Sequence, residues 1–178
     1  MKENTDETSA EVVAESVNDT LDRDQRVEKH ARNHILTAMG IGLFPLPIID
    51  MVALVGVQLD MIRTIANEYH VPFRRDLGKS VITTLLGGFV PVALGGTLAS
   101  LIKCIPLVGQ SAGAVTMPVV AGAATYAISR VFIQHFESGG TFLDMDPAKV
   151  KVHFAEQFEK GKKVASDLKK EGKASPAN

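Results

Sequence analysis

The pattern of apolar and polar positions predicts a helical chain. Asp22 and Gln25 fit a capping box at the start of a helix that becomes more apolar along its length. Pro45 and Pro47 then remove backbone donors and disfavour helix at the residues before them. Because proline is tolerated in a first turn, Pro47 suits the start of a second helix that continues to about His70. These elements predict a helical hairpin with a proline-rich elbow.

Two long runs without a charged residue follow this hairpin. Residues 80–102 are 23 consecutive uncharged positions and residues 104–129 are 26, separated by Lys103. Each run exceeds the roughly 20 residues that cross a bilayer core. Small residues recur at helical spacing, which lets two helix backbones approach closely. We therefore expect a second hairpin, strongly apolar and glycine-rich, with a glycine and proline elbow. The glycines at its packing positions are Gly88, Gly95, Gly109, Gly113 and Gly122.

The second hairpin has two interpretations. It either inserts into or packs against lipid, or forms the tightly packed core of a soluble helical bundle. The membrane interpretation is favoured because a domain of this size seldom buries two such runs on every side. Arg74, Arg75 and Lys79 precede the runs and Arg130 follows them, as in a hairpin with both ends cytoplasmic. Prolines within the runs leave open whether the hairpin spans the bilayer or is re-entrant.

The two ends of the chain are more polar than its centre. The first 21 residues are acidic and lack aromatic residues, which is typical of a disordered tail. Near the other end, Asp146 and Pro147 suit the start of an amphipathic lysine-rich helix. Its apolar stripe would lie on an anionic membrane or pack on the protein's own core. The predicted organisation is a disordered tail (1–21), a helical membrane-associated domain (22–142), an amphipathic helix (143–172) and a second disordered tail (173–178).

Composition and charge narrow the function classes. The 178 residues carry a net charge of −1, which argues against a nucleic-acid binder that works through global charge. The charge is segregated: −4 over residues 1–33, +1 over 34–140 and +2 over 141–178. Cys104 is the single cysteine, so an internal disulfide and a CxxC metal site are excluded. The N-terminus lacks the pattern of a secretory signal, and we expect it to stay in the cytoplasm.

Few residues are candidates for chemistry. The GKS at 78–80 looks like the end of a phosphate loop, but Phe73 stands where that motif needs glycine. His30 and His34 are four residues apart on a predicted helix, yet no third ligand completes a metal site. No Ser-His-Asp, paired-carboxylate or Cys-His arrangement is legible. We therefore expect no catalytic residues, cofactor or metal.

Asp50 and Gln58 interrupt apolar surroundings. Asp50 is either a proton or cation site, a buried anchor between helices, or a first-turn acid stabilised by the helix dipole. Gln58 lies on a mainly apolar face and predicts a hydrogen bond between helices. We expect these two residues to hold the first hairpin against the second.

The segment GLFPLPIIDMVALVGVQLDMIRTIANEYHV resembles the GTPase-associated domain of unknown function found in YcjF-like bacterial membrane proteins. IPLVG (105–109), GAATYAIS (122–129) and HFESGG (135–140) extend the resemblance over residues 28–142. It implies a mostly helical, membrane-associated domain that often neighbours an Era-like GTPase. Because the sequence holds no GTPase domain, such a partner would be a separate protein. The residues that carry the main motif are Gly42, Pro45, Pro47, Asp50, Ala53, Leu54, Gln58, Met61, Ile62 and Tyr69.

The sequence therefore predicts a non-enzymatic, all-α protein of the bacterial inner membrane with both termini in the cytoplasm. Its partners would be membrane lipid, a protein such as a GTPase, and in a homo-oligomer further copies of itself, but not nucleic acid. One alternative is a small oligomeric transporter or pore subunit lined by Asp50, Thr83, Thr84 and Thr97. Another is a soluble helical interaction module.

Overall fold

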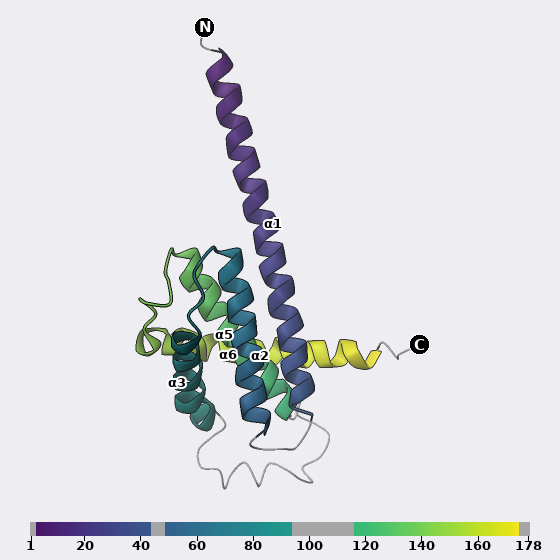
Figure 1. Cartoon of the computed structure of the whole chain (residues 1–178). Helices are drawn as coiled ribbons and strands as arrows, with labels where there is room; N and C mark the ends of the chain where they lie inside the picture. Colours follow the sequence, from purple (N-terminus) through teal and green to yellow (C-terminus); the bar gives the residue numbers. More distant parts are fainter. Residues whose placement is uncertain (1–2, 44–48, 94–115, 175–178) are drawn as a thin grey trace.

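The protein is an all-α bundle over the residues that the structure, a computed structural model, describes (Figure 1). These are residues 3–43, 49–93 and 116–174, with side chains described over 13–43, 52–87 and 116–171. The prediction of an all-α fold is confirmed. The helices are α1 (Glu3–Ile41), α2 (Ile49–Glu68), α3 (Arg75–Ala93), α5 (Met117–Glu137) and α6 (Pro147–Ala174).

The N-terminal segment differs from the prediction. Helix α1 begins at Glu3 and not near Asp22, so the disordered tail predicted for residues 1–21 is wrong over residues 3–21. This segment contains neither proline nor glycine that would stop a helix. A helix already held in the bundle also extends without the cost of a new nucleus. The N-terminal half of α1 consequently projects far beyond the other helices (Figure 1).

The first predicted hairpin is confirmed. Helices α1 and α2 pack side by side, and the buried stripe of α1 includes Val27, Ala31 and Ile35 at helical spacing. Helix α2 has an exposed polar face whose members recur at the three- and four-residue spacing of one side of a helix. Its members are Gly56, Asp60, Arg63 and Asn67. The proline elbow, with Pro45 and Pro47, lies outside the described residues.

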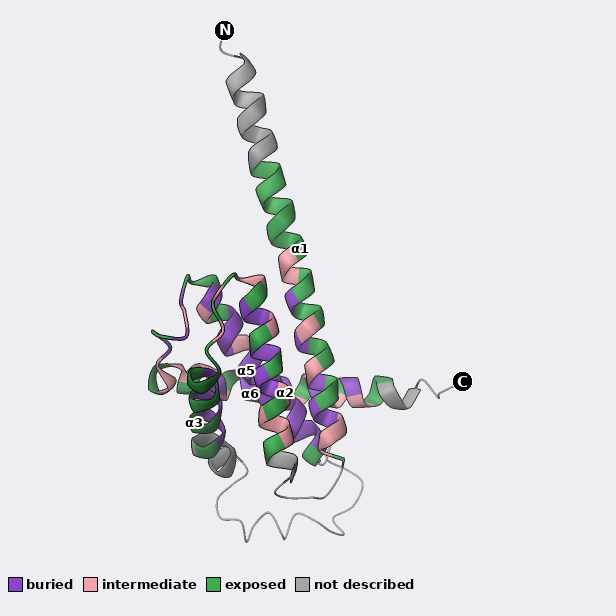
Figure 2. Ribbon diagram, viewed as in Figure 1, coloured by how far each residue is buried: buried purple, intermediate pink, exposed green. Residues whose placement is uncertain are grey.

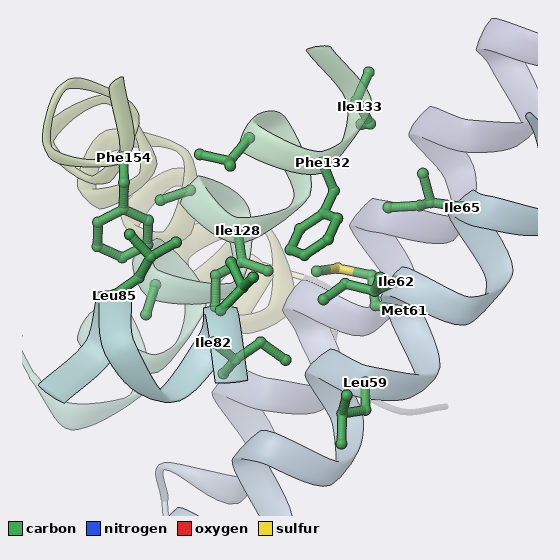
Figure 3. Packing of buried hydrophobic residues seen from close by; sticks show 14 of the residues in the cluster. Leu59, Met61, Ile62, Ile65, Ile82, Leu85, Ile128, Phe132, Ile133 and Phe154 are labelled. Carbon is green, nitrogen blue, oxygen red and sulfur yellow. The ribbon is translucent and has the colours of Figure 1, made fainter. Parts of the chain in front are cut away.

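Helix α5 is the centre of the fold. It packs against α6, α1 and α2, and 15 of its 21 residues are buried (Figure 2). Helix α3 lies against α2 and α6. Its Ile82 and Leu85 join α5's Ile128 and Phe132 in one apolar cluster (Figure 3). Residues 117–129 of the second uncharged run are thus covered largely by protein.

The close helix approach predicted for the second hairpin occurs with a different partner. A Cβ at Gly122 would lie 2.6 Å from Met39 Cγ of α1 and 3.0 Å from Ala165 Cβ of α6. At the same crossing, a Cβ at Gly161 of α6 would lie 2.8 Å from the Ala123 carbonyl oxygen. The small residues of α5 therefore admit α1 and α6, not α3 as expected. For the other four packing glycines, Gly88 is in α3 with surroundings that are not described, and Gly95, Gly109 and Gly113 lie outside the described residues.

Helix α6 follows one of its two interpretations. It begins at Pro147, and the Ala148 N–H donates to Asp146 Oδ1 at 2.9 Å, so the predicted cap is confirmed. Its apolar stripe, including Phe154 and Phe158, is buried and α6 packs mainly on α5. The stripe is therefore not available to lie on a membrane. Its end differs slightly from the prediction, because the helix continues to Ala174.

The sequence leaves open whether the second hairpin spans a bilayer, and residues 94–115 of it lie outside the described residues. Across the described ranges, no helix combines the length and hydropathy that a bilayer crossing requires.

Candidate functional site

The bundle has two contrasting ends. At one end, here called the apolar end, α1 and α3 finish and α2 and α5 begin (Figure 1). The helix segments that meet there are 35–43, 49–59, 80–93 and 116–129, and Asp50 is the single charged residue in their sequences. Leu43, Val52 and Met117 at this end are exposed by 68%, 73% and 61%. Four segments that are far apart in the sequence and hold one charged residue thus meet at an end where large apolar side chains are exposed.

Tight packing fixes the helix ends at this surface. A Cβ at Gly42 would lie 3.0 Å from the Pro118 backbone, so α1 closes directly on the first turn of α5. Lys169 Nζ of α6 donates to Thr116 Oγ1 at 3.0 Å and places a lysine beside the start of α5. Asp50 is in the first turn of α2, as one of its predicted interpretations requires, and its side chain is not described.

A buried polar contact joins α2 to α5. Gln58 is fully buried, and its Nε2 donates to Thr125 Oγ1 at 3.2 Å. Thr125 in turn donates to the Ala121 carbonyl at 2.9 Å. The predicted hydrogen bond between helices is therefore confirmed for Gln58. Its Oε1 is buried and has no hydrogen-bond partner among the described residues, so one buried acceptor is unsatisfied and reduces the net stabilisation by this contact.

The opposite end, here called the polar end, is held by charged groups. Arg130 of α5 forms two hydrogen bonds to the Glu28 carboxylate of α1, one of them 2.8 Å long from Nη2 to Oε2. The same guanidinium lies 5.0 Å from the centre of the Tyr126 ring. A cleft of about 420 Å³ beside this pair is lined by residues that include Glu28, Arg130 and His153. The sequence marks Arg130 only as a basic flank, because 102 residues separate it from Glu28.

Tyr69, the residue directly after α2, links the C-terminal end of α2 to α5 at the polar end. Its hydroxyl donates to Glu137 Oε1 at 3.0 Å, and Arg23 lies 4.8 Å from the ring centre. Burial, and then the hydrogen bond to Glu137, raise the pKa of Tyr69 well above its ordinary value. The following residue, His70, has a φ of +55° and turns the chain out of the helix.

The remaining candidate motifs have structural surroundings. Gly78 of the GKS sequence lies within α3, where a Cβ would touch Leu59 and Phe142 at 3.4 Å, so the segment is a packed helix and not a phosphate loop. His30 and His34 turn to different carboxylates, Glu68 at 3.6 Å and Asp60 at 3.1 Å. Within the described parts of the chain, no three His, Cys, Asp or Glu side chains converge on a common point. Cys104 lies outside these parts.

Known proteins resemble this chain over most of its length. A family described as a domain of unknown function (DUF697) matches residues 6–163, which include most of α1 and half of α6. Magnetosome membrane protein 22 of Magnetospirillum gryphiswaldense is 40% identical over 152 residues, which cover 85% of this chain and 78% of that protein. No solved structure matches the chain.

Proposed function

Since the chain belongs to the DUF697 family, a domain of unknown function, we propose that it is a non-enzymatic, membrane-associated helical protein whose apolar end faces lipid. In this proposal it serves as an anchor or effector for a partner protein at the bacterial inner membrane. Both termini would be on the cytoplasmic side.

The observation that carries the proposal is the composition of the apolar end. Its exposed side chains Leu43, Val52 and Met117 would remain in contact with water in the absence of a covering surface. The sequence segments that connect these helix ends, 44–48 and 94–115, contain one charged residue, Lys103. Both of these connecting segments, which are mostly apolar in sequence, therefore join helix ends that lie at the apolar end of the bundle.

Helix α3 adds exposed positions without charge from Ser80 onward, although Asp76 and Lys79 just before them are exposed and charged. Ser80, Thr83, Thr84 and Gly87 lie on one side of α3 and are exposed, and none carries a charge. A helix face next to the hydrocarbon of a lipid layer avoids the desolvation cost of a charge in this way. At the polar end, by contrast, the exposed surface carries charged groups such as Glu28 and Glu137. This difference supports the orientation proposed here.

The relative named magnetosome membrane protein 22 also supports a membrane location, because its identity to this chain extends over most of the helices. Resemblance to GTPase-associated domains makes a separate Era-like GTPase one candidate for the partner. In the alternative oligomeric pore, Thr83 and Thr84, which are exposed on α3, would have to face the path between copies of the chain.

The test is a measurement of which end of the bundle meets lipid. In a Cys104→Ser background, single cysteines at Met117 and at Leu143 would each carry an environment-sensitive nitrobenzoxadiazole probe. Both native side chains are large, apolar and exposed, but Leu143 lies beyond the opposite end of α5. Vesicles of phosphatidylethanolamine and phosphatidylglycerol, with and without spin-labelled lipid, would report contact through quenching.

We expect quenching at position 117 and little at position 143, together with retention of the protein in membranes after an alkaline carbonate wash. Equal quenching at the two positions would exclude the proposed orientation. Complete release by the wash, without quenching at either position, would replace the proposal with a soluble helical interaction module.

A further inference from the structure

We propose that Arg63, Arg75 and Lys79, where α2 and α3 meet, bind the phosphate group of an anionic phospholipid whose acyl chains lie along the uncharged part of the two helices. The inference rests on the proposed function, because it names the class of lipid that the apolar end would meet. The site lies on the side of the bundle formed by α2 and α3, between the apolar end and the connection from α2 to α3 (Figure 1).

Three cations from two helices come together at this junction. Arg63 of α2 and Arg75, the first residue of α3, line the same cleft of about 190 Å³. Lys79 follows Arg75 by one helical turn and lies on the same side of α3. All three side chains are exposed, and none forms an ion pair with a described residue. Neighbouring cations without a counter-charge repel one another, so they attract an anion.

The two nearby carboxylates do not neutralise these cations. Asp60 also lines the cleft, but its Oδ2 lies 3.1 Å from Nε2 of His34 on α1, on the other flank of α2. Asp76 is exposed and follows Arg75, so it is turned by about 100° around α3. Arg74, directly before α3, is exposed as well. Four cations thus outnumber two carboxylates, and the local charge is positive although the whole chain carries −1.

Between the cations and the apolar end, both helices present open, uncharged positions. On α3, Thr83 and Gly87 follow Lys79 at four-residue spacing and are exposed. On α2, Gly56 precedes Arg63 by seven residues, which places it on the same side of the helix. A Cβ added at either glycine would meet nothing within 4 Å. An acyl chain can lie over these positions without desolvating a charge.

The length of this uncharged part fits a phospholipid. Arg63 lies 14 residues from the start of α2 at Ile49, and Lys79 lies 14 residues before the end of α3 at Ala93. Both are therefore about 21 Å along their helices from the apolar end. The hydrocarbon of one leaflet is about 15 Å thick, so acyl chains would end within this length when the phosphate is at the cations. A soluble phosphate would use only the cations.

The test compares the full chain on vesicles of two compositions. One set contains phosphatidylcholine alone, and the other also contains phosphatidylglycerol. The lipid partition coefficient is measured by cosedimentation at several salt concentrations. We expect tighter binding to the vesicles with phosphatidylglycerol, and the difference between the two sets should shrink as salt is raised. Because the net charge of the chain is −1, its charge as a whole does not favour an anionic surface, and the preference requires a local site.

A triple variant locates the site. R63Q/R75Q/K79Q removes the three cations from exposed positions and keeps good helix formers, so circular dichroism and the urea midpoint should stay close to those of the native chain. At low salt it should bind the vesicles with phosphatidylglycerol about a hundredfold more weakly, because each lysine or arginine near an anionic surface contributes about fivefold. Its binding to phosphatidylcholine alone should be unchanged.

A control of equal charge separates a site from general attraction. K151Q/K160Q/K163Q removes three lysines of α6 that are exposed and form no ion pair with a described residue. It changes the net charge by the same amount as the triple variant. We expect it to bind within about twofold of the native chain on both sets of vesicles, because these lysines lie away from the junction of α2 and α3.

Three outcomes would overturn the inference. The first is equal binding of the native chain to the two sets of vesicles. The second is an equal loss of binding in R63Q/R75Q/K79Q and in the α6 control, which would mean that any cation suffices. The third is release of the chain from the vesicles by soluble glycerol phosphate beyond the release caused by sodium chloride of equal ionic strength. That result would assign the cations to a soluble anion.

The inference and the proposed function fail in different ways. Quenching of the probe at position 117 by spin-labelled phosphatidylcholine should be the same for the native chain and for R63Q/R75Q/K79Q at saturating lipid. If this quenching occurs without a preference for phosphatidylglycerol, the headgroup site is wrong and the proposed function stands. If the three cations confer that preference and position 117 is not quenched, the proposed orientation is wrong and the cations still bind the headgroup.

Discussion

Helices α3 and α5 come from two uncharged runs of similar composition, but the fold surrounds them differently. Most of α5 is buried, with α1, α2 and α6 packed around it. Helix α3 buries one face, including Val81, Ile82 and Leu85, while Thr83 and Thr84 on its other face are exposed. A run without charged residues therefore occurs in two different structural settings. In α5 there is little solvent-facing side to carry a charge, whereas in α3 the exposed positions from Ser80 to Gly87 are uncharged.

The largest expected effect is a difference in the free energy of unfolding between a variant in the buried helix α5 and one in the half-buried helix α3. Phe132→Ala in α5 removes a fully buried ring from the central cluster and should lower the free energy of unfolding by about 3–5 kcal/mol. Thr84→Ala on the exposed face of α3 should change it by less than about 0.5 kcal/mol. Urea unfolding followed by circular dichroism measures both. Similar losses for the two variants would mean that α3 is covered on both faces.

A smaller contrast uses one substitution in both helices. At Gly87 of α3 an added Cβ meets nothing within 4 Å, so Gly87→Ala should stabilise the protein by about 0.5–1 kcal/mol through helix propensity. At Gly122 of α5 the same Cβ lies 2.6 Å from Met39, and overpacking should cost about 1–3 kcal/mol before the propensity gain. Thermal unfolding compares the variants. A stabilising Gly122→Ala would show that Met39 moves aside without cost.

The smallest effect lies where α5 reaches the polar end, and it depends on pH. Tyr69→Phe removes the hydrogen bond to Glu137 and should cost about 0.5–1.5 kcal/mol near neutral pH. Because the folded state raises the pKa of Tyr69, the unfolded chain loses this proton first when pH rises above about 10. The native protein then loses stability that the variant does not lose, so the difference between them should shrink at alkaline pH.

The control for this prediction is the urea midpoint of each protein near neutral pH and at alkaline pH. Tyr126, the other tyrosine, is present in both proteins, so the comparison isolates the effect of Tyr69. A difference between the proteins that stays constant up to alkaline pH would contradict the raised pKa.

Local patterns predicted much of the fold. The exposed face of α2, the hydrogen bond of Gln58 and the cap at Asp146 all depend on residues a few positions apart, where helical periodicity is informative. The choice of partner helices was not predictable in this way. Gly122 signals a close approach, yet nothing near it in the sequence distinguishes α6 from α3.

The candidate sites also combine features that nearby residues predict with features that only the packing of distant segments creates. The apolar end could be anticipated as uncharged sequence, but only the fold brings its four segments together. The pair formed by Arg130 and Glu28 joins residues 102 positions apart and left no local signal. The helix over residues 3–21 was missed because composition describes an isolated segment, whereas this one is propagated from a helix that the bundle already holds.

The continuity of α1 from Glu3 to Ile41 has a mechanical consequence. A helix of 39 residues is a rod about 58 Å long. Its C-terminus lies at the apolar end, and its N-terminal half projects beyond the bundle. A flexible tether would leave the position of a bound partner undefined. A rigid helix instead fixes both the distance of the partner from the bundle and its direction around the helix axis. Each inserted turn would lift the partner by about 5.4 Å with nearly the same heading, and a half-turn would point it to the far side. The helix is in this sense a spacer of fixed length.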